Sequence, residues 1–114
     1  MIKGIGTDIV ENIRVNQSLA RRVLSDNELE AFEQLKLEQR KQEFLCGRFA
    51  AKEAIIKACS QANIEVFMRD ITILNDQLNR PFVANPKFER YQILVSISHE
   101  KDYSIAFAII ESLE

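Results

Sequence analysis

The sequence is poor in the residues that join separate domains or build secreted scaffolds. It has three glycines, two prolines and no tryptophan in 114 residues. It shows no repeat, no low-complexity tract and no Pro/Gly/Ser-rich linker, so we expect one domain over residues 1–114. Its two cysteines, Cys46 and Cys59, lack Cys-x-x-Cys or Cys/His spacing, which indicates buried free thiols rather than a disulfide framework or a zinc site.

Long apolar runs and an excess of positive charge are missing as well. The longest apolar stretches, such as 105–110, fall well short of the roughly 20 residues needed to cross a bilayer, and the N-terminus lacks a signal-peptide h-region. The formal net charge is −2, whereas non-specific nucleic-acid binders usually carry a basic excess. These absences predict a cytoplasmic protein without a membrane or nucleic-acid partner.

The first third of the chain predicts a strand followed by helices. Residues 2–10 are rich in β-branched side chains, and Gly4 and Gly6 would let another backbone approach this strand closely. A helical segment is expected around residues 13–23. The sequence of residues 25–28, Ser-Asp-Asn-Glu, fits a capping box, which predicts a helix that ends near residue 37.

A longer helix and a run of strands follow. The helix is expected at about residues 39–60. Strands are predicted at 71–74, 81–83, 93–98 and 103–110. Turn-prone segments separate them at 75–76, 79–81, 85–86 and 99–102. A strand, a block of helices and then several strands predict an α+β fold in which helices, including one long helix, pack on an antiparallel sheet.

Two cations fall inside the apolar face of the long helix. At about 100° per residue, Arg48 and Lys52 lie within the arc formed by Phe44, Leu45, Phe49, Ile55, Ile56 and Cys59. Their charged ends can reach water along the core surface, or they can form an anion site rich in phosphate contacts. Spacing alone favours neither. A second stripe on this helix consists only of small residues, which permits close packing of another backbone: Gly47, Ala51, Ala54 and Ala58.

Asp8 and His99 are unusual at their positions. β-propensity disfavours the Asp8 carboxylate among β-branched residues, and it either caps the next helix together with Glu11 or binds a metal. His99, the single histidine, follows a predicted strand, where a polar turn residue is common. Both residues could converge with Glu53, Lys52 and Lys57 of the long helix. Asp8 and Glu53 would then supply two hard oxygen ligands for Mg²⁺, and the two lysines and His99 would supply three phosphate-binding groups. Those are the components of phosphoryl transfer.

Three segments carry a resemblance to a known family. They are Gly-Ile-Gly-Thr-Asp-Ile-Val-Glu at 4–11, Gly-Arg-Phe-Ala-Ala-Lys-Glu-Ala at 47–54 and Ser-Ile-Ser-His at 96–99. In order and spacing they resemble the signature segments of the holo-acyl-carrier-protein synthases, and the similarity extends over essentially the whole chain. The resemblance implies the 4'-phosphopantetheinyl transferase fold and a homotrimer with active sites between subunits. It also implies transfer of 4'-phosphopantetheine from coenzyme A to a serine of apo acyl carrier protein, in support of fatty acid biosynthesis.

The resemblance also implies roles for individual residues. Asp8 and Glu53 would hold Mg²⁺ against the pyrophosphate of coenzyme A. Lys52, Lys57, Arg48 and His99 would neutralise or hydrogen-bond the phosphates, with Arg40 a weaker candidate at the nucleotide end. The carrier serine would attack the β-phosphate in line, and 3',5'-ADP would leave. Glu53 would take the serine proton directly or through a water on the metal, and the sequence leaves both routes open.

A basic segment follows the first strand. Between Asn12 and Leu24 there are three arginines and no acidic residue: Arg14, Arg21 and Arg22. A solvated helix face explains this pattern, and so does docking of the acidic helix that carrier proteins of this system present. Docking would raise the association rate more than the intrinsic affinity.

The sequence departs from the family pattern at three places. The connection at 59–64 has no glycine where relatives often have several, Ile56 stands where a hydroxyl residue is common, and Glu100 stands where relatives often carry threonine.

Two other function classes fit the sequence. One is a Mg²⁺-dependent hydrolase of coenzyme A or a nucleotide, which would need no carrier protein. The other is a noncatalytic scaffold in which Asp8 is only a cap.

Overall fold

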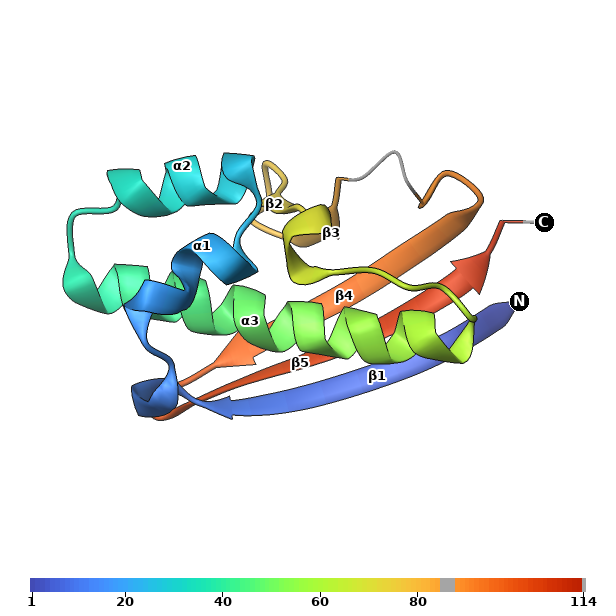
Figure 1. Cartoon of the computed structure of the whole chain (residues 1–114), viewed down its shortest axis with the longest axis horizontal. Coiled ribbons are helices and arrows are strands. Elements are labelled where there is room, and N and C mark those ends of the chain that lie inside the picture. Colours follow the sequence, from blue (N-terminus) through green and yellow to red (C-terminus); the bar gives the residue numbers. More distant parts are fainter. Residues whose placement is uncertain (85–87, 114) are drawn as a thin grey trace.

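The computed structural model describes residues 1–84 and 88–113 and confirms the α+β class. Among these residues, three long strands form an antiparallel sheet in the order β1-β5-β4. They are β1 (Ile2–Glu11), β4 (Tyr91–His99) and β5 (Tyr103–Ser112). The short strands β2 (Ile73–Asn75) and β3 (Pro81–Val83) pair separately. Figure 1 shows the long helix α3 (Glu38–Gln61) lying along one face of the larger sheet.

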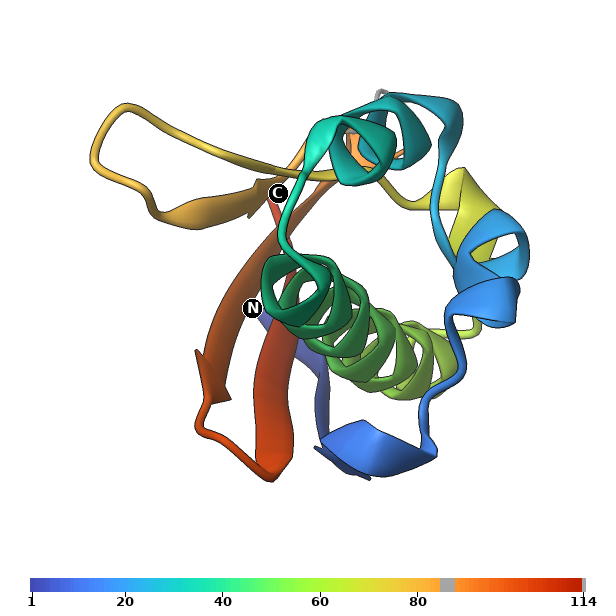
Figure 2. The ribbon, with the colours of Figure 1, turned by 90° about the vertical axis from the view of Figure 1, so that its left-hand side faces the viewer.

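Two smaller helices cover the other side of α3. These are α1 (Ala20–Val23) and α2 (Asp26–Gln34), and Figure 2 shows α3 between them and the sheet. The helix predicted around 13–23 is instead built from the 3-10 turns η1 (Asn12–Arg14) and η2 (Gln17–Leu19) followed by the single turn of α1. A third 3-10 turn, η3 (Met68–Asp70), lies between α3 and β2. None of the helices in the described ranges is both long and apolar enough to span a membrane.

Because α3 is covered on two sides, it contributes to two apolar cores. The core against the sheet includes Ala54, Ile55 and Ala58 of α3 together with Ala106 and Ala108 of β5. The core against the smaller helices joins Leu45 and Cys46 of α3 to further apolar residues, which are Val15, Ala20, Val23, Leu24 and Phe32. Both cysteines are buried, and neither forms a disulfide within the described residues. A single amphipathic stripe could not serve both cores, which is why apolar residues occur around much of this helix.

The close approach predicted at Gly4 and Gly6 is confirmed, and α3 is the element that approaches. A Cβ atom at Gly4 would lie 2.0 Å from the carbonyl oxygen of Ala58, and one at Gly6 would lie 2.0 Å from that of Ala54. The small-residue stripe of α3 therefore packs against the sheet of its own chain. The backbone that this stripe permits to pack closely is therefore a strand of the same chain and not a neighbouring subunit, because the alanines of the stripe are fully buried within the chain.

The end of α3 explains how a glycine-free connection is possible. Asn63 adopts the left-handed conformation, with φ of 59°. Its N–H donates to the Ser60 carbonyl at 3.1 Å, and the Ile64 N–H donates to the Cys59 carbonyl at 2.9 Å. This is a Schellman motif in which asparagine occupies the position usually taken by glycine. The turn predicted at 85–86 lies outside the described residues.

Candidate active site

Asp8 lies in the middle of β1 and points toward α3. Its backbone pairs with Ala106 of β5, and its side chain is 18% exposed. The Lys57 ammonium of α3 lies 3.1 Å from Oδ1 of Asp8 and donates to the Thr7 carbonyl oxygen at 3.0 Å. The capping alternative for Asp8 is wrong, because β1 continues to Glu11 and Glu11 itself precedes η1.

Asp8 and Glu53 line the same open groove, of about 380 Å³. Glu53 projects from α3, is half-buried, and makes no hydrogen bond or ion pair with any described residue, so its carboxylate is available to a ligand. Glu11, Arg14 and Phe49 complete much of the lining. The groove therefore presents two carboxylates that come from different elements, with the Lys57 ammonium beside one of them.

These two carboxylates fit a magnesium ion. Mg²⁺ commonly binds proteins through one or two carboxylates and completes its octahedral coordination with water and substrate phosphates. Within residues 1–84 and 88–113 there is no group of three or more His, Cys, Asp or Glu side chains that could hold a metal by themselves. The donor set at Asp8 and Glu53 thus suits a hard cation that also binds a phosphate-bearing substrate.

Arg40, Arg48 and His99 line a second groove, of about 510 Å³. His99 is exposed at the end of β4, and Arg40 is exposed near the start of α3. Arg48 is buried; its Nη2 donates to the Ile73 carbonyl at 3.2 Å, and its guanidinium lies 4.3 Å from the ring centroid of Phe44. Burial lowers the pKa of Arg48, and its buried Nε has no partner among the described residues. This groove therefore offers hydrogen-bond donors to an anion from the two arginines and from His99.

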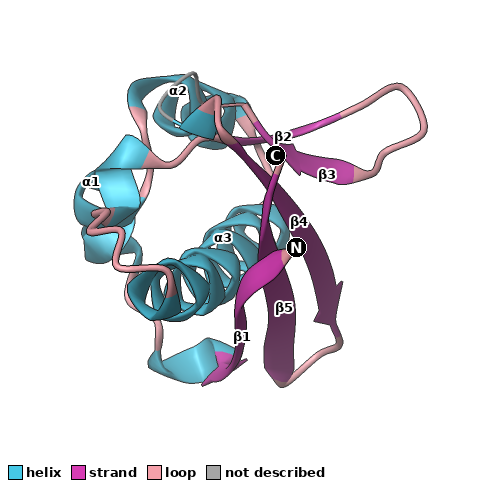
Figure 3. Ribbon diagram, turned by 90° about the vertical axis from the view of Figure 1, so that its right-hand side faces the viewer, coloured by secondary structure: helices cyan, strands magenta, loops and turns pink. Residues whose placement is uncertain are grey.

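The two grooves lie on different sides of the chain. Asp8 belongs to β1 and His99 to β4, and Figure 3 shows that these strands flank β5 on opposite sides. Helix α3 runs over the sheet, with Glu53 and Lys57 toward β1 and Arg48 toward the β4 side. Within one chain, the first groove brings together Asp8 and Glu53, with Lys57 beside Asp8. The second groove brings together Arg40, Arg48 and His99. The convergence of all these groups that we considered does not occur within a single chain.

Lys52 belongs to neither groove. Its side chain is fully buried, and its ammonium forms an ion pair with Glu28 and donates to the carbonyl oxygens of Val23 at 2.7 Å and Met68 at 2.9 Å. Burial lowers the pKa of Lys52, an effect that the charge of Glu28 opposes. The three N–H donors of the ammonium are thereby used. The structure does not support the expected phosphate contact for Lys52, nor the alternative in which its charged end reaches water.

Glu28 is the partner that sequence reasoning missed. Its Oε1 accepts from the Ser25 N–H at 2.9 Å, as the capping box predicted, and its Oε2 accepts from the Ile73 N–H at 2.8 Å. The capping pattern located the carboxylate at the start of α2. It contained no signal that a lysine 24 positions away in the sequence would share it, because that contact depends on how α2 packs on α3.

The predicted docking arginines are exposed. Arg14 lies in η1 at the edge of the groove that holds Asp8 and Glu53, and its Nε is 3.9 Å from a Glu11 carboxylate oxygen. Arg21 and Arg22 lie on α1. Arg69 of η3 adds a further cation to this side; it donates to the Arg21 carbonyl oxygen and pairs with Asp26.

Large apolar side chains cover the face of the sheet that points away from α3. Ile9 and Ile105 are direct cross-strand partners, and Phe107 is paired with Thr7 and Ser96 on the two neighbouring strands. The large apolar residues on this face are between 41% and 61% exposed: Ile5, Ile9, Leu94, Tyr103, Ile105 and Phe107. An apolar surface of this kind is typical of a protein–protein contact.

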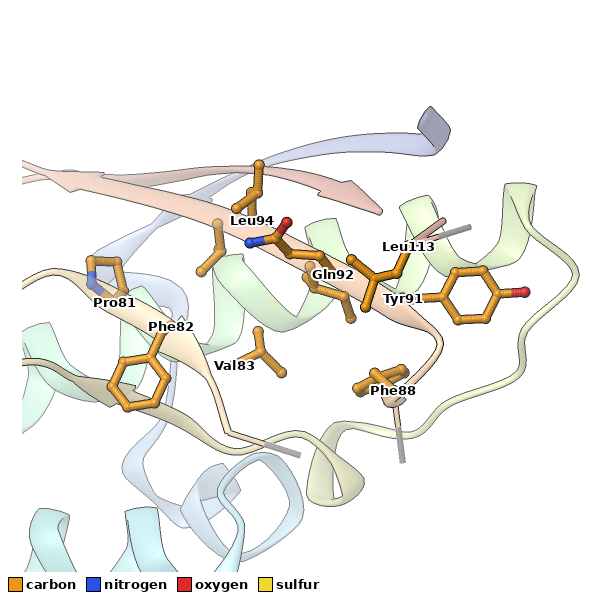
Figure 4. A pocket seen from close by; sticks show the side chains of 10 residues that line it. Pro81, Phe82, Val83, Phe88, Tyr91, Gln92, Leu94 and Leu113 are labelled. Atoms are coloured by element: carbon orange, nitrogen blue, oxygen red, sulfur yellow. The ribbon is translucent and has the colours of Figure 1, made fainter. Parts of the chain in front are cut away.

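A further groove, of about 480 Å³, lies between β3 and β4. Figure 4 shows Phe82, Val83, Phe88, Tyr91 and Leu113 around it. None of the described residues that line it carries a charged side chain.

Comparison with known proteins places this arrangement in a family. Residues 4–108 match the model of the 4'-phosphopantetheinyl transferase superfamily. The chain is 44% identical to a holo-[acyl-carrier-protein] synthase of Anoxybacillus flavithermus, over 99% of this chain and 98% of that protein. It is 40% identical to a holo-[acyl-carrier-protein] synthase of Bacillus subtilis, with the same coverage of both chains.

Solved structures agree with the sequence comparison. The crystal structure of a holo-(acyl-carrier-protein) synthase from Bacillus anthracis, in complex with CoA (3',5'-ADP), superposes with a TM-score of 0.85 at 36% identity and covers 98% of each chain. The synthase of Thermotoga maritima superposes with a TM-score of 0.83 at 32% identity, over 98% of this chain and 65% of that one. Because sequence and fold agree over nearly the whole chain, this protein belongs to the holo-[acyl-carrier-protein] synthase family of the 4'-phosphopantetheinyl transferase superfamily.

Proposed function

We propose that this protein transfers the 4'-phosphopantetheine group of coenzyme A to a serine of apo acyl carrier protein, in the cytoplasm and in support of fatty acid biosynthesis. The observation that carries the proposal is the groove in which Asp8 and Glu53 face one ligand space, with Lys57 beside Asp8. Membership of the synthase family, and the CoA bound by the related Bacillus anthracis synthase, support the same substrate.

Asp8 and Glu53 would hold Mg²⁺ in this groove. When bound, the ion would polarise a phosphoryl oxygen and offset the charge that develops on it. Lys57 is 52% exposed and close to Asp8, so its ammonium can also hydrogen-bond a phosphate that enters the groove. These groups bind and orient the pyrophosphate, which accounts for much of the catalysis in phosphoryl transfer.

Glu53 is the group best placed to remove the proton of the carrier serine, because its carboxylate has no partner among the described residues. The serine oxygen forms a bond to the β-phosphorus, and the bond from that phosphorus to the leaving oxygen of 3',5'-ADP breaks. The serine proton passes to Glu53, directly or through one intervening water. Arg40, Arg48 and His99 would bind the nucleotide end of coenzyme A.

A homotrimer with active sites between subunits reconciles the two separate grooves. The Asp8 groove and the His99 groove lie on opposite sides of one chain, and a head-to-tail ring would place one of each at every subunit contact. The exposed apolar face of the sheet gives such a ring a surface to bury. Each active site would then combine the carboxylates of one subunit with the nucleotide-binding groups of its neighbour.

Arg14, Arg21 and Arg22 would dock the carrier protein. Arg14 lines the same groove as Asp8 and Glu53, so a carrier held by this arginine would present its serine beside the proposed base. Carrier proteins of this system offer an acidic helix next to the modified serine, and opposite charge speeds such encounters.

Intact-mass spectrometry of apo acyl carrier protein tests the proposal. The carrier is incubated with the protein, coenzyme A and Mg²⁺, alongside Asp8→Ala and Glu53→Ala variants whose folding is checked by circular dichroism. We expect a gain of about 340 Da, one phosphopantetheine, with the wild type and a loss of that gain in both variants. Consumption of coenzyme A without a gain in carrier mass would indicate the hydrolase instead, and no consumption would indicate the scaffold.

A further inference from the structure

We propose that Asn12 is a positioning residue for His99, and through it for the nucleotide end of the active site. Asn12 belongs to η1, far from the second groove in sequence, and is only 6% exposed. The inference rests on the nucleotide-binding role proposed for His99. It adds a residue to that site which does not itself touch the ligand.

Asn12 holds the turn between β4 and β5 through four hydrogen bonds. Its Nδ2 donates to the carbonyl oxygens of Glu100 at 3.0 Å and Lys101 at 3.2 Å. Its Oδ1 accepts from the Ser104 hydroxyl at 2.8 Å. Its backbone N–H donates to the Asp102 carbonyl at 2.7 Å. One buried residue therefore fixes nearly the whole turn that reverses the chain after His99.

Two of these contacts are to direct neighbours of His99, one along the chain and one across the sheet. Glu100 follows it in the chain, and Ser104 is its cross-strand partner in the sheet. The imidazole of His99 makes no hydrogen bond to any side chain or backbone group of the described residues, so its place in the groove depends on the backbone that carries it and on packing. The position of the backbone there is fixed in large part by Asn12.

Asn12 also connects this turn to the helix that carries Arg40. Its carbonyl oxygen accepts from Gln42 Nε2 at 2.8 Å, and the same nitrogen donates to the Val15 carbonyl at 2.6 Å. Gln42 lies two residues after Arg40 on α3. His99 and Arg40, which line the same groove, are thus held in one frame by contacts to a single asparagine.

Binding of 3',5'-ADP to the full-length protein, measured by calorimetry, tests the inference. The variants are Asn12→Ala, Ser104→Ala and His99→Ala, each assayed well below its own melting temperature. We expect Asn12→Ala to raise the Kd for 3',5'-ADP roughly tenfold, because a small displacement of a binding group sharply weakens its contacts. Ser104→Ala should shift the Kd in the same direction by less. The KM for the carrier protein should stay within about twofold of wild type for both, because neither Asn12 nor Ser104 lines the groove of Asp8, Glu53 and Arg14 at which we expect the carrier to dock.

Asn16→Ala is the matched control. Asn16 is an exposed asparagine that caps η2 through the Ser18 N–H at 2.8 Å and does not contact the turn after β4. Its Kd for 3',5'-ADP should equal that of wild type. A role of Asn12 in stability alone would lower the melting temperature and leave the Kd of the folded variant unchanged, which would overturn the inference.

Three further outcomes are decisive. If Asn12→Ala does not fold, an unchanged Kd in Ser104→Ala rejects the inference and a raised Kd supports it. If His99→Ala weakens nucleotide binding and Asn12→Ala does not, the positioning role fails and the role of His99 stands. If His99→Ala binds 3',5'-ADP as wild type does, the proposed role of His99 fails, and the inference fails with it.

Discussion

The Lys57 ammonium lies 3.1 Å from Oδ1 of Asp8, so a cation of α3 meets a carboxylate of β1 across two separate elements. The same ammonium donates to the Thr7 carbonyl oxygen. One helix turn further along, the Gln61 side chain exchanges two hydrogen bonds of 3.0 Å with the backbone of Ile5. Side chains of α3 therefore hydrogen-bond the backbone groups at the outer edge of β1 and hold this strand against the helix that carries Glu53.

Replacing Lys57 by methionine should separate catalysis from stability. We expect kcat/KM for carrier loading to fall about 100-fold, because a phosphate-binding cation is lost from the groove. The free energy of unfolding should fall by less than about 1 kcal/mol, since exposed ion pairs contribute little. Urea titration and the mass assay measure the two quantities. Lys36→Met, at an exposed lysine outside both grooves, is the control, and equal activity of the two variants would contradict the role of Lys57.

The buried pair of Lys52 and Glu28 should contribute to stability, in contrast to the exposed Lys57. Glu28→Gln leaves the Lys52 charge buried without its partner, which typically costs about 3–5 kcal/mol. Urea unfolding at neutral pH measures this loss. Glu30→Gln, on the exposed face of the same helix, should change stability by less than about 0.5 kcal/mol. A free energy of unfolding of Glu28→Gln within about 1 kcal/mol of the wild-type value would show that the ion pair does not stabilise the fold.

Cys46 should make the fold less stable at alkaline pH. Burial raises the pKa of its thiol to about 11, and a hydrogen bond from Gln42 opposes only part of that rise. An unfolded cysteine ionises near pH 8.5, so between roughly pH 8.5 and 11 the folded state holds a proton that the unfolded state has lost. Stability must then fall as pH rises through this window, by about 1.4 kcal/mol per unit once the unfolded thiol is ionised.

The Cys46→Ala variant isolates this contribution. Urea unfolding of both proteins between pH 8 and 11 should give a shallower loss of stability in the variant than in the wild type. The difference between the two slopes is the measured quantity, because the variant also loses some packing at every pH. Parallel curves would contradict the raised pKa.

Two glycine substitutions should have opposite effects. Gly6→Ala places a Cβ 2.0 Å from the Ala54 carbonyl oxygen, which forces α3 away from β1, and we expect a loss of at least about 3 kcal/mol or failure to fold. Gly47→Ala meets only the Ile97 Cγ2 atom, at 3.4 Å. It should raise stability by up to about 1 kcal/mol, because alanine favours a helix interior. Thermal unfolding of both variants checks the pair, and similar effects of the two would contradict the close packing described.

Mixing two inactive variants tests whether active sites are shared between subunits. Asp8→Ala and His99→Ala should each lose transfer activity. Co-expressed in equal amounts, they should recover up to about a quarter of wild-type activity, because some subunit contacts then combine an intact Asp8 with an intact His99. Absence of recovery in mixed oligomers, verified by tagged co-purification, would place both residues in one chain's own site.

The fold followed from local patterns where these were strong. Strand-like composition and the turn-prone segments between strands predicted β1, β4 and β5 nearly to their ends, and the capping box correctly predicted the start of α2. The segment at 12–24 was predicted less well, because its short 3-10 turns lack a sustained helical period. Asn63 shows a similar limit, since its left-handed turn replaces a glycine without any pattern that announces it.

The amino-acid sequence by itself determined the family, the α+β class and the residues proposed to bind metal and phosphate, because these depend on short motifs and local periodicity. Only the tertiary structure decided which of those residues meet. It placed Asp8 and Glu53 in one groove, His99 in another, and Lys52 in the core against Glu28. The reason is physical: a side chain's partners depend on how α3 packs between the sheet and the smaller helices, and no spacing along α3 specifies which of its two covered sides an ionic group will face.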